Sequence, residues 1–245
     1  MKQIGPEDVT AVVLAGGFGT RIKHLLGDLP KPMVPVCGKP FIDWVVRYLA
    51  EQNVRRVILS TGYMAQTIHD HFQSQAVNDV QVTCVPESTP LGTAGGFLHA
   101  IHGACHLASA WLVLNGDSLS LVSLKDLFRS LNKFECAISG VSVSDASRFG
   151  KILVNAKGEL KAFMEKEPGS GVINAGVYLF RAPLVEQFPR QTPLSFETDV
   201  FPTLLSCGVR IKVCVTEAPF LDIGTPDSLP QAEDFVQRHR EFFEA

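Results

Sequence analysis

The stretch that decides the fold runs from Val9 to Arg21 and reads VTAVVLAGGFGTR. Its apolar, β-branched beginning, Val9 to Ala15, predicts a buried strand. The glycines that follow, Gly16, Gly17 and Gly19, predict a tight turn, in which backbone N–H groups can approach phosphate oxygens because no Cβ intervenes. The stretch therefore indicates a strand followed by a candidate phosphate-binding turn, with a purely structural turn as the alternative.

Strands and helices are predicted to alternate beyond this first strand. Short apolar runs rich in β-branched residues predict the strands, and apolar positions three or four residues apart predict the helices. This alternation predicts an α/β fold, a single Rossmann-like domain with a mostly parallel sheet flanked by helices. The predicted strands cover residues 9–15, 57–61, 80–85, 111–115 and 136–143, and the predicted helices cover residues 41–52, 65–72, 93–105 and 124–134.

The pattern changes after about residue 145, where short strands separated by glycine turns predict hairpins and a smaller β-rich lobe. We therefore expect one domain over residues 1–245, with one half at about 1–145 and a second at about 146–245. A terminal helix is predicted over 227–243. The strands predicted in the second half are 151–154, 160–165, 172–180 and 211–215.

The composition excludes several classes of protein. The chain has 22 basic and 25 acidic side chains, a net charge of −3, and 46% hydrophobic residues, so it should fold and offers no basic field for nucleic acid. Its start lacks the apolar run of a secretory leader, and no stretch of about 18 apolar residues predicts a membrane helix. We therefore expect a cytoplasmic protein that binds neither nucleic acid nor membrane.

Two common phosphate-binding motifs do not fit the glycine turn. The dinucleotide fingerprint would need a third glycine where Ile22 stands, and no acidic residue closes the second predicted strand at Thr61. A Walker A loop would need Gly-Lys-Ser or Gly-Lys-Thr after the turn. A nicotinamide-dependent oxidoreductase is therefore disfavoured.

The glycine turn continues into the segment from Pro30 to Pro40, PKPMVPVCGKP. Together, LAGGFGTRI and PKPMVPVCGKP resemble the signature of the sugar-1-phosphate nucleotidylyltransferases, LAGGxGTRL followed by PKPMxPVxGKP. One departure from the family pattern is Glu167, which turns the usual EKP into EKEP. Further matching motifs occur in order at residues 90–96, 114–117, 149–151, 163–166, 174–178, 196–200 and 222–226.

The resemblance implies attack of a sugar-1-phosphate oxygen on the α-phosphorus of a nucleoside triphosphate, with loss of pyrophosphate. Bringing two polyanions together requires cationic clamping, for which Arg21 and Lys31 are suited. By family position, Lys166 would hold the phosphate of the incoming sugar. Asp117 and Asp222 would ligate Mg²⁺, a hard cation that takes oxygen ligands.

The same resemblance assigns binding residues. The sugar pocket would include Gly150, Glu165, Asn174 and Gly176. The nucleotide site would include Leu14, Ala15, Gly16, Gly17, Gly19, Thr20, Glu87, Gly92, Thr93, Asn115 and Gly116.

The choice of base is argued from Glu87, which stands three residues before the PLGTAG loop. Guanine presents N1–H and N2–H₂ as adjacent donors, which a carboxylate can accept with both oxygens. Glu87 therefore favours GTP over UTP. The alternative is that Glu87 faces solvent and the loop backbone alone reads the base.

The closing segment from Phe220 to Pro226, FLDIGTP, resembles the short D-glycero-D-manno-heptose 1-phosphate guanylyltransferases, which lack a C-terminal hexapeptide-repeat domain. This resemblance favours GDP-heptose as a product for capsule or lipopolysaccharide. N-acetylmuramic acid 1-phosphate uridylyltransferases and mannose-1-phosphate guanylyltransferases are the alternatives. A nonenzymatic nucleotide sensor is disfavoured because the cations and metal ligands are retained. The terminal helix could support a homodimer.

Overall fold

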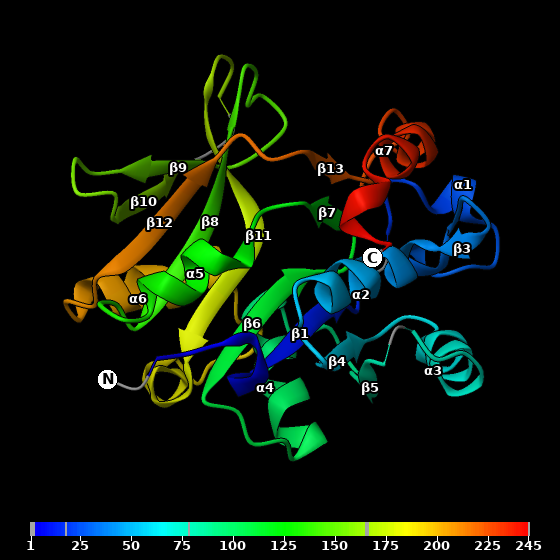
Figure 1. The fold of residues 1–245 in the computed structure, drawn as a ribbon, viewed down its shortest axis with the longest axis horizontal. Helices are drawn as coiled ribbons and strands as arrows, with labels where there is room; N and C mark the ends of the chain where they lie inside the picture. The colour runs from blue at the N-terminus through cyan, green and yellow to red at the C-terminus, as the bar shows by residue number, and fades with distance from the viewer. Residues whose placement is uncertain (1–2, 18, 78, 165–166, 245) are drawn as a thin grey trace.

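Strand β1 (Val9–Ala15) lies at the centre of the main sheet, between the parallel strands β4 (Arg56–Thr61) and β6 (Ala110–Asn115). The computed structural model shown in Figure 1 describes residues 3–17, 19–77, 79–164 and 167–244. Every residue of β1 except Leu14 is buried. Because both faces of β1 are covered, its sequence is a continuous apolar run rather than an alternation.

The parallel part of the sheet is extended by an antiparallel strand, β11 (Gly171–Arg181), which pairs with β6 on one side and β8 (Cys136–Val143) on the other. Figure 1 shows β11 between the two halves of the molecule. Within the described residues the main sheet has nine strands: β10 (Leu160–Met164), β9 (Lys151–Val154), β11, β6, β1, β4 and β5 (Gln81–Pro86) in that order, with β8 and β12 (Ile211–Thr216) joined through β11.

The α/β fold predicted from the sequence is confirmed. The strands expected at 9–15, 136–143 and 151–154 match residue for residue. The terminal helix is shorter than the expected 227–243. It consists of α7 (Ala232–Arg238) between two 3-10 turns, and Pro230 stands in the first of these turns, where it supplies no backbone N–H for a regular helix.

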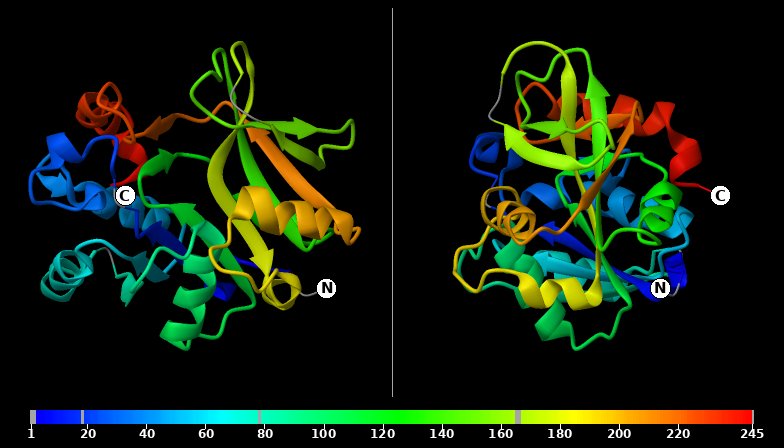
Figure 2. Two further views of the ribbon diagram at one scale, coloured as in Figure 1. Left: turned by 180° about the vertical axis from the view of Figure 1, so that it is seen from behind. Right: turned by 90° about the vertical axis from the view of Figure 1, so that its left-hand side faces the viewer.

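Helices cover both faces of the main sheet, as Figure 2 shows in two further views. One apolar cluster contains α2 (Phe41–Glu51), α3 (Ala65–Ser74) and α5 (Leu124–Ser130), and the opposite cluster contains α4 (Thr93–Ala104) and α6 (Phe201–Ser206). No helix in the described chain is both long enough and apolar enough to cross a bilayer.

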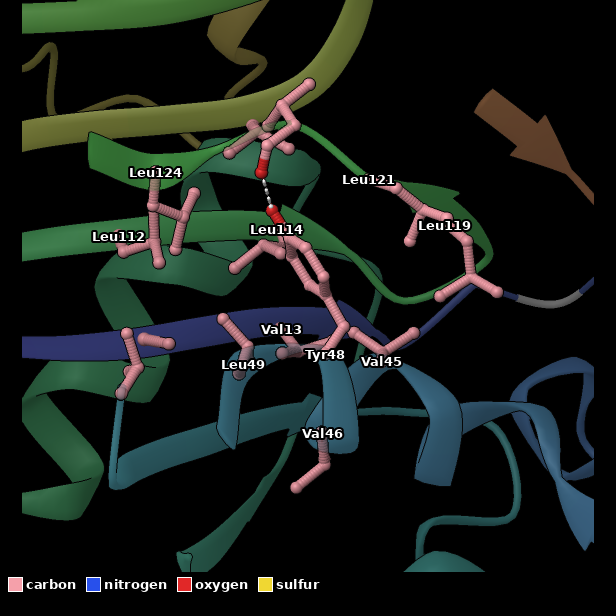
Figure 3. Packing of buried hydrophobic residues seen from close by; sticks show 14 of the residues in the cluster. Val13, Val45, Val46, Tyr48, Leu49, Leu112, Leu114, Leu119, Leu121 and Leu124 are labelled. Carbon is pink, nitrogen blue, oxygen red and sulfur yellow. Dashed lines mark hydrogen bonds between the residues drawn. The ribbon is translucent and has the colours of Figure 1, made fainter. Parts of the chain in front are cut away.

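Tyr48 of α2 anchors the first cluster. Figure 3 shows its ring among Val13, Leu49 and Leu114, and its hydroxyl donates to the carbonyl of Val122 at 2.5 Å. Burial raises the pKa of Tyr48 well above its ordinary value, so the hydroxyl keeps its proton and stays a donor. This bond fixes α2 against the segment that leads into α5.

Two small sheets, which the sequence did not predict, lie beside the main one. Strand β7 (Ser118–Ser120) pairs antiparallel with β13 (Phe220–Asp222), and β2 (Pro35–Val36) pairs with β3 (Lys39–Pro40). These strands are too short to give a period-2 pattern. The pairing of β7 with β13 places Asp222 opposite Ser118, and therefore next to Asp117.

Candidate active site

A cavity of about 490 Å³ opens at the carboxyl ends of β1 and β6. This is the edge of a parallel sheet at which ligands are expected. Of the residues predicted to bind nucleotide, all except Gly116 line the cavity, together with Arg21, Lys31, Asp117 and Asp222. The structure adds Pro32, Pro90, Leu91 and Gly224, each of which stands inside one of the sequence motifs quoted above.

Gly16, the first glycine of the turn after β1, is packed closely against Gly62 and Glu87. A Cβ added to Gly62, which follows β4, would lie 2.5 Å from the carbonyl oxygen of Gly16. A Cβ added to Gly16 would lie 2.9 Å from Oε1 of Glu87. Packing therefore favours glycine at positions 16 and 62, whereas a Cβ at Gly17 would meet no atom within 4 Å.

Lys31 lies at the bottom of this cavity with its side chain only 9% exposed. Its Nζ donates to Oδ2 of Asp117 at 2.7 Å and lies 4.0 Å from Oδ1 of Asp222. Because a buried ammonium needs a partner, these two carboxylates serve as its counterions. The arrangement concentrates three charged groups at one place in the cavity.

Asp117 and Asp222 together form a candidate cation site. Burial raises the pKa of Asp222, the charge of Asp117 raises it further, and the ammonium of Lys31 opposes both effects. In the described part of the chain no three histidine, cysteine, aspartate or glutamate side chains gather around one point. Two carboxylates with phosphate oxygens and water nevertheless suit Mg²⁺, which is commonly held by one or two carboxylates and the substrate.

Glu87 faces the cavity rather than bulk solvent alone, and both of its carboxylate oxygens are oriented. Oε1 accepts from the hydroxyl of Ser60 at 2.7 Å, and Oε2 accepts from the backbone N–H of Leu91 at 3.3 Å. Ser60, which is fully buried, was not singled out in the sequence, because a serine inside a strand carries no local signal of function. Each oxygen keeps acceptor capacity for a ligand.

Four other predicted residues do not line the cavity. Gly116 packs behind Leu14, whose carbonyl would lie 2.8 Å from a Cβ at position 116. Gly150, Asn174 and Gly176 lie in or beside the second half of the sheet. Their roles as sugar ligands stay predictions. Glu165 and Lys166 lie outside the described residues.

Known proteins with similar sequences are nucleotidyl transferases. A model of the nucleotidyl transferase family matches residues 10–239. A mannose-1-phosphate guanylyltransferase of Mycobacterium tuberculosis is 36% identical over 235 residues, covering 94% of this chain; the chain spans only 63% of that relative's length. A D-glycero-alpha-D-manno-heptose 1-phosphate guanylyltransferase of Campylobacter jejuni is 30% identical, covering 89% of this chain and 95% of the relative.

The fold is also similar to that of a solved structure, HddC from Yersinia pseudotuberculosis complexed with GMP-PN. That structure aligns with a TM-score of 0.81 and 36% identity over 92% of this chain and 98% of HddC. The family match extends over almost the whole sequence, including both halves of the sheet and the cavity between the glycine turn and Asp222. The chain belongs to the nucleotidyl transferase family.

Proposed function

We propose that the protein transfers a guanylyl group from GTP to D-glycero-α-D-manno-heptose 1-phosphate, giving GDP-heptose and pyrophosphate. The observation that carries this proposal is the buried ammonium of Lys31 between Asp117 and Asp222, in a cavity whose other wall is the glycine turn. Such a site suits the transfer of a nucleotidyl group from a triphosphate to a sugar phosphate. In this reaction positioning and charge stabilisation supply most of the catalysis.

In the proposed reaction, a phosphate oxygen of the sugar 1-phosphate forms a bond to the α-phosphorus, and the bond from that phosphorus to pyrophosphate breaks. Arg21 and Lys31 bind the triphosphate and stabilise the negative charge that builds up on its oxygens. The backbone N–H groups of the glycine turn orient the same phosphates. Lys166 is proposed to hold the sugar phosphate. No side-chain nucleophile is required.

Asp117 and Asp222 are the residues that would hold Mg²⁺, and we propose Mg²⁺ as the metal. When bound, a divalent cation neutralises phosphate oxygens and polarises the phosphorus. The ammonium of Lys31 donates to Oδ2 of Asp117, so it would lie beside a cation held by the two carboxylates.

Glu87 supports the choice of GTP. Its two oxygens are fixed by Ser60 and Leu91 with a free acceptor site on each, which matches the paired donors of guanine. Uracil offers one N–H between two carbonyls, and those carbonyls would face a carboxylate. The Campylobacter relative is named a guanylyltransferase, and HddC was solved in complex with GMP-PN; both favour guanine as the base.

Heptose 1-phosphate is favoured by the Campylobacter relative, and mannose 1-phosphate is the second candidate because of the mycobacterial one. The proposal includes a cytoplasmic location, where GTP is available. It also includes a homodimer formed through α7, which a solution mass measurement would test.

The test is a matrix of four nucleoside triphosphates against heptose, mannose, glucose and N-acetylmuramic acid 1-phosphates, with pyrophosphate release as the readout. We expect release from GTP with heptose 1-phosphate, only when Mg²⁺ is present. Turnover with UTP and N-acetylmuramic acid 1-phosphate, but not with GTP and heptose 1-phosphate, would refute the choice of both substrates.

A further inference from the structure

Glu197, in the wide helical turn η4 (Phe196–Val200), has a carboxylate that the phosphate chemistry above does not use. Its Oε1 accepts from the hydroxyl of Tyr178 at 2.7 Å and from Nδ2 of Asn174 at 3.1 Å. Its Oε2 accepts from the hydroxyl of Ser195 at 3.1 Å. Three donors therefore hold this carboxylate in one orientation.

The amide of Asn174 is fully committed as a donor. Its Nδ2 donates to the Tyr178 hydroxyl at 2.7 Å as well as to Glu197. Its Oδ1 accepts from the backbone N–H of Gly176 at 3.0 Å. An amide nitrogen carries two N–H groups, so Asn174 has none left for a ligand and keeps only a lone pair on Oδ1.

The carboxylate of Glu197 has acceptor capacity to spare. A carboxylate offers about four acceptor sites, and three are taken, so one site on Oε2 is free. Tyr178 is completely buried, and burial together with the charge of Glu197 raises the pKa of its hydroxyl. The hydroxyl therefore stays protonated and remains a donor to Glu197. The network as a whole can receive hydrogen bonds from a ligand, but its Asn174 and Tyr178 hydrogens are already used.

This network lies against the wall of the nucleotide cavity. The backbone N–H of Phe196 donates to the hydroxyl of Thr93, a cavity residue, at 3.1 Å. On the other side, a Cβ added to Gly176 would lie 2.4 Å from Nδ2 of Asn115, which also lines the cavity. Glu197 itself is only half-buried. A ligand that extends from the cavity toward β11 would thus meet an oriented acceptor.

We propose that Glu197 is a specificity-determining residue that accepts a hydrogen bond from a hydroxyl group of the sugar 1-phosphate. Tyr178 and Asn174 are positioning residues that orient its carboxylate. The inference rests on the proposed function, because it requires a polyhydroxylated acceptor beside the nucleotide. It adds Glu197 to the sugar-pocket residues that the family pattern implies, which are Gly150, Glu165, Asn174 and Gly176.

The first experiment compares E197Q with the wild-type enzyme under steady-state conditions, using GTP and whichever sugar 1-phosphate the wild type accepts. Loss of one hydrogen bond to a charged group should raise KM for the sugar phosphate about tenfold, while KM for GTP stays unchanged. Y178F should raise the same constant by a smaller factor, since it removes one of the donors that orient Glu197. E186Q, at an exposed glutamate of η3 (Ala182–Gln187), is the matched control and should match the wild type.

The second experiment uses a series of monodeoxy analogues of the accepted sugar 1-phosphate. If Glu197 binds one hydroxyl, the wild type should lose about tenfold in kcat/KM with one analogue, and E197Q should treat that analogue like the parent sugar. Unchanged KM in E197Q, or an equal loss with every analogue in both proteins, would overturn the proposal. GTP-induced thermal stabilisation checks folding. If GTP does not stabilise E197Q, the same series of analogues is measured with Y178F. A loss of kcat/KM with one analogue that is smaller than in the wild type would support the proposal. A loss equal to that of the wild type would contradict it.

The two proposals fail differently. If the wild type releases pyrophosphate with no pair of triphosphate and sugar phosphate, the proposed function is wrong, and the role of Glu197 is refuted with it. If the wild type turns over but E197Q has wild-type constants, only the role of Glu197 is refuted.

Discussion

Replacing Lys31 with methionine tests whether this lysine competes with a divalent cation for the paired aspartates. Nζ of Lys31 lies 2.7 Å from Oδ2 of Asp117 and 4.0 Å from Oδ1 of Asp222. A cation held by these carboxylates would be repelled by the ammonium. Methionine keeps the apolar stem of the side chain and removes its charge, so the cavity stays filled while the competitor is lost.

The size of the effect follows from Coulomb's law. A divalent cation and an ammonium about 5 Å apart repel each other by about 7 kcal/mol at an effective dielectric constant of about 20, and by about 1.7 kcal/mol at the dielectric constant of water. Asp117 is 43% exposed, so solvent screening brings the repulsion close to its value in water. We take about 1.5 kcal/mol, which corresponds to roughly tenfold in affinity. The variant should therefore bind Mn²⁺, used as a probe for Mg²⁺, about tenfold more tightly. Its turnover should fall by about 100-fold or more, because a group that stabilises the transferred phosphate is missing.

The assay is a titration of nucleotide-free protein with Mn²⁺, followed by electron paramagnetic resonance, alongside pyrophosphate release under saturating substrates. Lys125→Met, at an exposed position of α5, serves as the control and should leave both quantities unchanged. Unchanged or weaker metal binding in the Lys31 variant would refute the competition. Turnover near that of the wild type would remove Lys31 from the catalytic site.

Three further substitutions test other parts of the structure. Glu87→Gln should lower kcat/KM for GTP by roughly 10- to 100-fold and leave kcat/KM for UTP, where it is measurable, unchanged; equal losses with both nucleotides would argue against base reading. Gly176→Ala, at a φ of +66° and with a Cβ 2.4 Å from Nδ2 of Asn115, should destabilise the fold by about 1–3 kcal/mol in urea titrations, and a wild-type midpoint would contradict the packing described here. Tyr48→Phe removes the buried bond to Val122 and should lower the free energy of unfolding by about 1–2 kcal/mol without changing KM; a change in KM would point to a link between this core contact and the cavity.

Much of the fold could be predicted because its signals are local. The run from Val9 to Ala15 is apolar throughout, and the structure confirms a strand over those residues. The pairing of β7 with β13 was not predictable in the same way. Each strand has three residues, and their partnership depends on how the second half of the chain returns to the first.

The site shows the same division. Arg21, Lys31 and Asp117 were identified from their motifs, since residue type and spacing are sufficient for that. The contact between Lys31 and Asp117 joins residues 86 positions apart, and only the packed sheet brings them within 2.7 Å. Ser60, the partner of Glu87, carries no signal of its own in the sequence.

The sequence by itself determined the class of fold, the glycine turn and the family, because periodicity and residue type act over a few neighbouring positions. Only the tertiary structure decided which charges share a site, that both N–H groups of Asn174 are occupied, and that Glu197 keeps an acceptor free. The physical reason is that hydrogen-bond occupancy and burial depend on groups that are distant in sequence. The residue type determines how many hydrogen bonds a side chain can make, but its neighbours in space determine how many donor and acceptor sites remain for a ligand.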